Sequence, residues 1–192
     1  MYIRNCDYFH KVMVTLSLFL LTLLTSTTLP AGSLSATDQS PQSKCDSPGA
    51  HQFDFWVGEW KLNWNGGSGS NTITKEYDGC VIRENFQANP DSTSLPTELP
   101  PLRGMSISVY LPNQEMWRQT WVDNSGAYLD FVGKFSDGKM VLAREFNGKN
   151  DIPIKQRMTF YNITSDSLDW NWESAVGDDE WKLLWKIHYS RK

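Results

Sequence analysis

The tryptophans of this chain are spaced in a way that favours β-strands with one aromatic face. The even spacings are those between Trp56, Trp60 and Trp64, between Trp117 and Trp121, between Trp170 and Trp172, and between Trp181 and Trp185. A spacing of four fits a strand or a helix, but the spacing of two between Trp170 and Trp172 puts both indoles on one face only in a strand. We therefore expect a β-structure with an unusually aromatic interior.

Short segments of alternating apolar and polar residues follow residue 58, separated by turn residues such as Asp137-Gly138. The predicted strands are residues 59–64, 71–77, 80–86, 104–110, 117–123, 127–135, 140–146, 154–163, 168–174 and 180–190. A short apolar helical turn at 53–57 precedes them. Ten sequential strands with short connections predict an all-β fold, a single up-and-down antiparallel β-barrel. A sandwich is the alternative, but closure into a barrel removes the edge strands.

One predicted connection is much longer than the others. Residues 87–103 contain four prolines, which cannot pair in the interior of a sheet. We expect this segment to fold over one end of the barrel. If it carried a surface for a partner protein, the barrel would be a non-catalytic scaffold.

The start of the chain has the pattern of a secretory signal peptide. A weakly basic beginning and an apolar run at residues 13–24 precede a stretch of small residues. The run is shorter than the roughly 20 apolar residues that a membrane anchor needs. The predicted parts are therefore a signal peptide at residues 1–35, a flexible N-terminal arm at 36–50 and a barrel domain at 51–192. This organisation predicts export to the periplasm or to the outside of the cell.

Two cysteines remain once the predicted signal peptide, which contains Cys6, is set aside. Cys45 and Cys80 would meet an oxidising compartment, where a disulfide is the expected state. Two free thiols are the alternative. No pair of Cys or His residues has the spacing of a metal site, so we expect no bound metal.

The charge balance argues against one class of partner. The formal net charge is −4 and stays negative without residues 1–35, which hold Arg4, Lys11 and Asp7. Proteins that bind nucleic acids present clustered Lys and Arg to the phosphates. We therefore expect no nucleic acid partner.

Four polar side chains share a strand face with apolar neighbours: Glu84, Gln119, Asp123 and Gln156. A buried polar group costs several kcal/mol unless it is hydrogen-bonded. Glu84, between Ile82 and Phe86, would have a raised pKa in an apolar barrel and is the candidate for a catalytic acid or base. Alternatively, Glu84 and Asp123 lie at barrel ends, in contact with water or backbone amides. Asp123 directly precedes a turn, which favours a capping role.

The aromatic residues themselves are candidates for binding a ligand. With Glu84, Gln119 and Gln156, the predicted binding set comprises Trp64, Trp117, Trp121, Trp170, Trp172 and Trp185. These indoles either fill the interior or line a pocket. A barrel of this strand number can enclose one small ligand, and indole walls favour a flat or apolar guest.

The opening of the barrel domain resembles a known group. Gly58-Glu59-Trp60 is similar to the G-x-W opening of calycins, which include lipocalins and fatty-acid-binding proteins. The longer strings at 53–60 and 117–126 resemble an exported bacterial family of uncharacterised function. The resemblance implies a calycin-like barrel in which Gly58 and Trp60 are structural and a basic side chain from the last strand, here Arg191, covers Trp60. It brings no established catalytic residues.

Some ten-stranded calycins bind haem through a histidine on a late strand. His188 is the candidate for that role here. Alternation places His188 on the same face as Lys186 and opposite Trp185 and Ile187, so we expect its side chain to point to solvent. We therefore predict no haem and no other cofactor.

These observations predict an exported binding protein that holds a small apolar or aromatic molecule. One alternative is a small-molecule enzyme that uses Glu84 for acid–base chemistry. The other is the scaffold with a partner-binding loop at residues 87–103. A solid interior would rule out the first hypothesis, and a wide exposed apolar patch beside residues 87–103 would support the scaffold.

Overall fold

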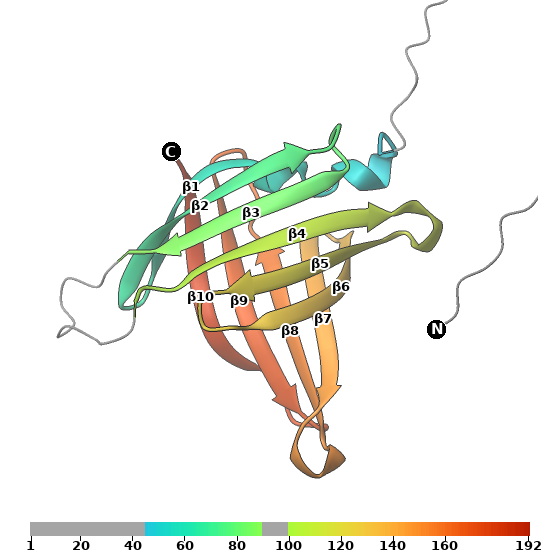
Figure 1. Ribbon diagram of the computed structural model, residues 1–192, viewed down its shortest axis with the longest axis vertical. Coiled ribbons are helices and arrows are strands. Elements are labelled where there is room, and N and C mark those ends of the chain that lie inside the picture. Colours follow the sequence, from blue (N-terminus) through green and yellow to red (C-terminus); the bar gives the residue numbers. More distant parts are fainter. Residues whose placement is uncertain (1–44, 90–99) are drawn as a thin grey trace, which may run out of the picture. The chain divides into compact units, whose positions relative to one another are not determined.

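The computed structural model describes residues 45–89 and 100–192, which form a closed antiparallel β-barrel (Figure 1). The strands are β1 (Gly58–Trp64), β2 (Gly67–Glu76), β3 (Val81–Ala88), β4 (Arg103–Leu111), β5 (Met116–Asp123), β6 (Tyr128–Ser136), β7 (Lys139–Asn147), β8 (Pro153–Tyr161), β9 (Ser167–Val176) and β10 (Lys182–Arg191). Each strand pairs with its neighbours in sequence, and β1 pairs with β10 to close the ring. The predicted up-and-down barrel of ten strands is confirmed.

Tight turns are the reason that each strand returns beside the one before it. Between β6 and β7, Asp137 (φ 50°) and Gly138 (φ 70°) both adopt left-handed backbone conformations. Two such residues make the hairpin turn whose twist matches that of the flanking strands. Ser136 and Lys139 accordingly form the last pair of this hairpin.

Two 3-10 turns, η1 (Pro48–His51) and η2 (Asp54–Trp56), precede β1 and carry apolar side chains into the barrel. Phe53 and Trp56 are almost fully buried. The Phe53 ring meets Trp117 and Phe160 edge to face, with 5.0 and 5.4 Å between ring centroids. The apolar turn predicted before the first strand is thus present and plugs the end where β1 begins. A third 3-10 turn, η3 (Pro112–Gln114), joins β4 to β5, and a fourth, η4 (Lys149–Asp151), joins β7 to β8.

Arg191, at the end of β10, ties this plug to the barrel. Its guanidinium lies 4.0 Å from the centroid of the buried Trp60 ring. The same group donates hydrogen bonds to the backbone oxygens of Val57 (2.5 Å) and Phe55 (3.1 Å). Gly58 has φ +134°, and a Cβ there would lie 2.0 Å from the Arg191 guanidinium. Glycine therefore suits this position on both conformational and steric grounds.

Cys45 and Cys80 form a disulfide, with 5.0 Å between their Cα atoms. The bond joins the segment before η1 to the residue that precedes β3. The predicted pairing is confirmed, and the last residues of the predicted arm, 45–50, are anchored to the barrel through it.

The sequence analysis predicts a second strand at 71–77, but β2 already begins at Gly67, so the glycine-rich segment before residue 71 is paired strand. A Cβ at Gly67 would lie 2.4 Å from the indole nitrogen of Trp64, and one at Gly69 would lie 3.2 Å from the same ring. The Trp64 indole therefore packs directly against the backbone of Gly67 and Gly69, where any larger residue would place a Cβ in its way. These glycines serve a close side-chain approach within a paired strand.

The predicted alternation along the last strand is wrong at its first residues. β10 starts at Lys182, and its pairing with β9 shifts register between Leu183 and Trp185. This bulge leaves Leu183 and Leu184 each 50% exposed, whereas the alternation of Trp185 and Ile187, continued back along the strand, predicts Leu183 inside. Trp181 lies outside the strand, 4.1 Å beneath the Arg157 guanidinium.

Several sequence predictions concern residues outside those that the structure describes. They are the signal peptide at 1–35, residues 36–44 of the arm and residues 90–99 of the long connection. The flanks of that connection belong to the sheet, since Gln87 pairs with Arg103 across β3 and β4. No helix within 45–89 or 100–192 has the length and apolarity needed to cross a membrane.

Candidate functional site

The interior of the barrel contains a partly open cavity of about 200 Å³. Trp56 from the plug and Phe160 from β8 lie at its inner end, since both pack against the Phe53 ring. An engineered apolar cavity of about 150 Å³ is large enough to bind benzene. The interior therefore has room for a molecule of one or two rings.

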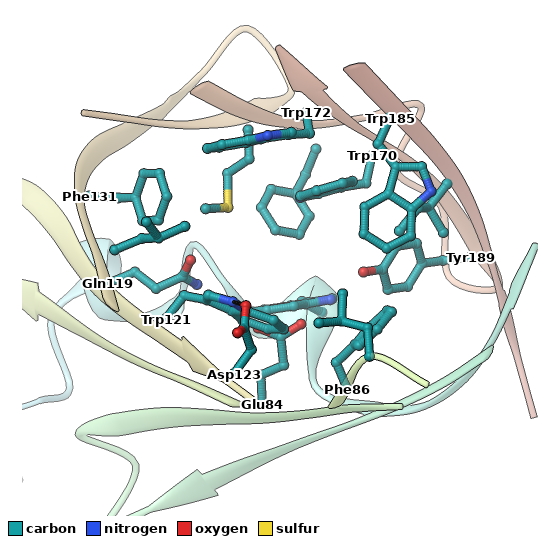
Figure 2. A pocket seen from close by; sticks show the side chains of 16 residues that line it. Glu84, Phe86, Gln119, Trp121, Asp123, Phe131, Trp170, Trp172, Trp185 and Tyr189 are labelled. Atoms are coloured by element: carbon teal, nitrogen blue, oxygen red, sulfur yellow. Dashed lines mark hydrogen bonds between the residues drawn. The ribbon is translucent and has the colours of Figure 1, made fainter. Parts of the chain in front are cut away.

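Aromatic rings from six strands and from the plug surround this space (Figure 2). They are Trp56, Phe86, Trp121, Phe131, Phe160, Trp170, Trp172, Trp185 and Tyr189. Neighbouring rings meet edge to face, as in the Trp170–Trp185 pair at 5.9 Å and 89°. Gly104 makes room for Trp121, because a Cβ there would lie 2.1 Å from the indole. This packing holds the indoles in place around the space that they leave.

Glu84 brings a carboxyl group into this aromatic cavity (Figure 2). It is 6% exposed and lies mid-strand on β3, opposite Ser106 on β4 and Ile73 on β2. Asn71 Nδ2 donates to Glu84 Oε1 at 2.7 Å, and the Ser106 hydroxyl donates to Oε2 at 2.6 Å. Burial raises the pKa of Glu84 to about 7, although these two hydrogen bonds oppose the rise.

The polar cluster around Glu84 continues on both sides. The Asn71 amide also lies 3.4 Å from the Tyr189 hydroxyl, which points toward the centre of the cavity in Figure 2. The amide of Gln119 donates to the Ser108 hydroxyl at 2.9 Å. Burial, and after it the charge of Glu84, raises the pKa of Tyr189 above its ordinary value. Tyr189 therefore remains a neutral hydroxyl.

The buried Asn71 Oδ1 and Trp56 Nε1 have no hydrogen-bond partner within the described chain. A buried polar atom without a partner costs about 1–3 kcal/mol. Trp56 lines the cavity, and Asn71 contacts two residues that do. One unused donor and one unused acceptor thus lie in or next to the cavity wall.

Asp123 has the capping role that the sequence favours and also lines the cavity. Its Oδ1 accepts hydrogen bonds from the backbone N–H groups of Ser125 (2.8 Å) and Ala127 (3.2 Å), while Oδ2 accepts one from Trp121 Nε1 (2.9 Å). Partial burial acts to raise the pKa of Asp123, but the hydrogen bonds outweigh it and the pKa is lowered. Asp123 is therefore an ionised cap that fixes the Trp121 indole.

The structure brings six of the predicted binding residues to the cavity and leaves three out. The six are Glu84, Gln119, Trp121, Trp170, Trp172 and Trp185. Trp117 lies at the plug, where it contacts Phe53, and Trp64 lies behind the rings of Phe86 and Trp185. Gln156 pairs with Arg144 and Ser174 near the opposite end. Alternation predicts which face of a strand a side chain lies on but not its position along the barrel axis, and these three side chains lie away from the cavity.

The sequence analysis missed the small polar residues that hold Glu84. Ser106 and Ser108 are buried, whereas Ile107 between them is 45% exposed, so the usual apolar-in alternation is reversed on β4. Asn71 is fully buried on β2. The available signal was that Asn71 shares a face with Ile73 and that Ser106 and Ser108 share one face of a strand.

His188 lies outside the cavity, with an exposed side chain and Nδ1 at 2.9 Å from Asp169 Oδ1. Burial acts to raise the pKa of Asp169, but hydrogen bonds from His188 and Asn162 help to lower it. Within the described residues, no group of three or more His, Cys, Asp or Glu side chains could hold a metal ion.

Comparison with models of protein families and with curated proteins found no match to this sequence. We therefore infer the chemistry of the cavity from its own side chains.

Proposed function

We propose that this protein is an exported, calycin-like binding protein that holds a small apolar or aromatic molecule inside its barrel. The observation that carries the proposal is the cavity of about 200 Å³ lined by nine aromatic rings. Enclosed spaces with apolar walls and a few convergent polar groups are typical of small-molecule sites. Flat rings offer a guest a large contact area.

The calycin-like character and the export are supported by separate features. The closed meander of ten strands, with Arg191 over Trp60 behind a plug, is the arrangement that the G-x-W resemblance implies. The Cys45–Cys80 disulfide supports export, because structural disulfides persist in oxidising compartments. Secretion can be checked by fractionating cells and probing each fraction for the protein.

A variant that fills the cavity tests the proposed function. Leu129 lines the cavity, whereas the preceding residue, Tyr128, is 66% exposed on the outside of the same strand. We expect Leu129→Trp to occupy the space and to weaken binding of 2-phenylethanol at least tenfold. The matched control Tyr128→Trp should bind as the unmodified protein does. Isothermal titration calorimetry measures both, and thermal unfolding shows whether each variant is folded.

Native mass spectrometry of the protein purified from its own compartment provides a second test. We expect a bound molecule of low mass that is absent from the Leu129→Trp variant. Unmodified protein that carries no guest and binds no one- or two-ring compound would rule out the proposed function.

Glu84 gives specific support to a second candidate, an enzyme that performs acid–base chemistry on the bound molecule. A general acid or base works best when its pKa is near the working pH, and burial raises the pKa of Glu84 to about 7. In such an enzyme Glu84→Gln would abolish turnover of the co-purified molecule while leaving it bound. Turnover unchanged by this substitution would exclude the enzymatic role and leave the binding role intact.

A further inference from the structure

The described residues that line the cavity have an unbalanced set of ionisable groups. They include two carboxyl groups, Glu84 and Asp123, and one phenol, Tyr189, but no lysine, arginine or histidine. Every ionisable side chain among them is thus either negative or neutral. A ligand that enters this cavity meets carboxyl groups that can pair with positive charge, and no residue that lines the cavity carries a positive charge.

Glu84 in particular lacks an opposite charge. Its two hydrogen-bond donors, Asn71 and Ser106, are neutral, and it forms no salt bridge with any described residue. An ionised carboxylate buried without a partner is costly. A positively charged group of a ligand, placed beside Glu84, would supply the missing charge.

The aromatic walls of the cavity, like the Glu84 carboxylate, favour a positively charged ligand. Rings attract positive charge to their faces, and tryptophan does so most strongly. Five of the nine rings that line the cavity belong to tryptophans: Trp56, Trp121, Trp170, Trp172 and Trp185. In Figure 2, Glu84 and Asp123 rise from one side of the cavity, while Trp170, Trp172 and Trp185 face them from the other. A guest between the two sides would contact carboxylate and indole together.

We propose that the ligand is an organic cation: a protonated amine on a skeleton of one or two rings, with its ammonium group beside Glu84 and its rings among the indoles. This inference deepens the binding function proposed above and rests on it. The cavity volume of about 200 Å³ limits the skeleton to this size. Anionic guests of the same shape, such as aryl carboxylates, would place like charge against Glu84.

Three ligands of nearly equal shape and different charge test the inference. They are 2-phenylethylamine (positive), 2-phenylethanol (neutral) and phenylacetate (negative). At pH 8 we expect calorimetry to show the amine binding at least tenfold more tightly than the alcohol, and phenylacetate binding more weakly than either. The Glu84→Gln variant should lose this preference for the amine and bind the alcohol within about threefold of the unmodified protein.

The pH dependence provides a readout that needs no substitution. Below pH 7 the amine must displace a proton from Glu84, so its affinity should fall by nearly tenfold for each further pH unit. The other ionisable groups that face Glu84 do not interfere between pH 5 and 8, because the pKa of Asp123 is lowered and that of Tyr189 is raised. The alcohol should show no such loss of affinity toward low pH.

The possible outcomes separate this inference from the function on which it rests. If the alcohol binds and the amine binds no more tightly, or if phenylacetate binds best, the inference that the ligand is a cation is wrong. The proposed binding function then still stands. An amine affinity that stays constant from pH 5 to 8 would also overturn the role of Glu84. If none of the three binds, the inference of a cation fails, and the guest carried by the native protein then decides whether the binding function stands.

Discussion

Glu84 makes the stability of the barrel depend on pH in an unusual direction. Burial raises the pKa of Glu84 from an ordinary 4.5 to about 7 in the folded protein. Between these two pH values the unfolded chain has released the proton and the folded protein still holds it. The contribution of Glu84 is therefore most favourable below pH 4.5 and is lost as the pH rises to about 7.

We predict that the free energy of unfolding falls with rising pH through this window, by up to about 3 kcal/mol, and that Glu84→Gln removes the fall. Denaturant unfolding at pH 5, 6, 7 and 8 measures both proteins. The hydrogen bond and charge of Asp54 raise the pKa of His51, but any contribution of His51 cancels in the difference between the two proteins. Parallel curves for the two proteins would mean that Glu84 is already ionised when buried.

Single residues also show how far alternation predicts this site. Glu84, Gln119 and Trp172 could be placed inside because a strand face is a local property of the sequence. The support given to Glu84 by Asn71 could not be predicted, because the two residues meet only when β2 and β3 pair in one register. Alternation also predicts that Trp117 belongs to this site. Its position along the barrel axis depends on its contact with Phe53 of the plug, which no local pattern predicts.

At the scale of elements, the contact between β10 and the plug depends on one guanidinium. Arg191 donates to three backbone oxygens, those of Phe55, Val57 and Ser165, and covers Trp60. A lysine ammonium is a point donor on a flexible stem and cannot reach three carbonyls in this geometry. The plug in turn supplies Trp56 to the cavity, so this contact supports the site as well as the fold.

We predict that Arg191→Lys lowers the free energy of unfolding by about 2 kcal/mol, because the partly buried carbonyls of Phe55 and Val57 lose charge-assisted hydrogen bonds. The next residue is the matched control. Lys192 is 3.8 Å from Glu59 in an exposed ion pair, so Lys192→Gln should change stability by less than about 0.5 kcal/mol. Unfolding of both variants in guanidinium chloride measures these changes in the free energy of unfolding. Similar small losses would show that the plug is held by its apolar side chains alone.

The limits of elements were harder to predict than their existence. Alternation and turn residues gave all ten strands, because both signals are local. The start of β2 and the bulge in β10 could not be predicted, because each depends on tertiary contacts. Gly67 and Gly69 leave room for Trp64, and the bulge resets which face of β10 is buried.

At the scale of the whole molecule, closure of the barrel explains how one chain keeps an interior space. β1 pairs with β10, so every strand has two neighbours and no edge is left open. The walls are then fixed by backbone hydrogen bonds, while the side chains leave about 200 Å³ between them. The sequence could predict the closed barrel from its count of short hairpins. Whether the rings fill the interior or surround a space depends on how they pack edge to face, which no local pattern records.

The Cys45–Cys80 disulfide cross-links the segment before the plug to the barrel. Its removal should lower the stability of the whole molecule. The two cysteines are 35 residues apart. Cross-linking a loop of this length removes conformational freedom from the unfolded chain that corresponds to about 4 kcal/mol. We predict that the Cys45→Ser, Cys80→Ser double variant loses roughly 2–4 kcal/mol of unfolding free energy. Unmodified protein unfolded in the presence of dithiothreitol should show the same loss, whereas the reductant should not affect the double variant. Equal stability of oxidised and reduced protein would show that the plug stays docked without the covalent link, and the disulfide would then lose its structural role.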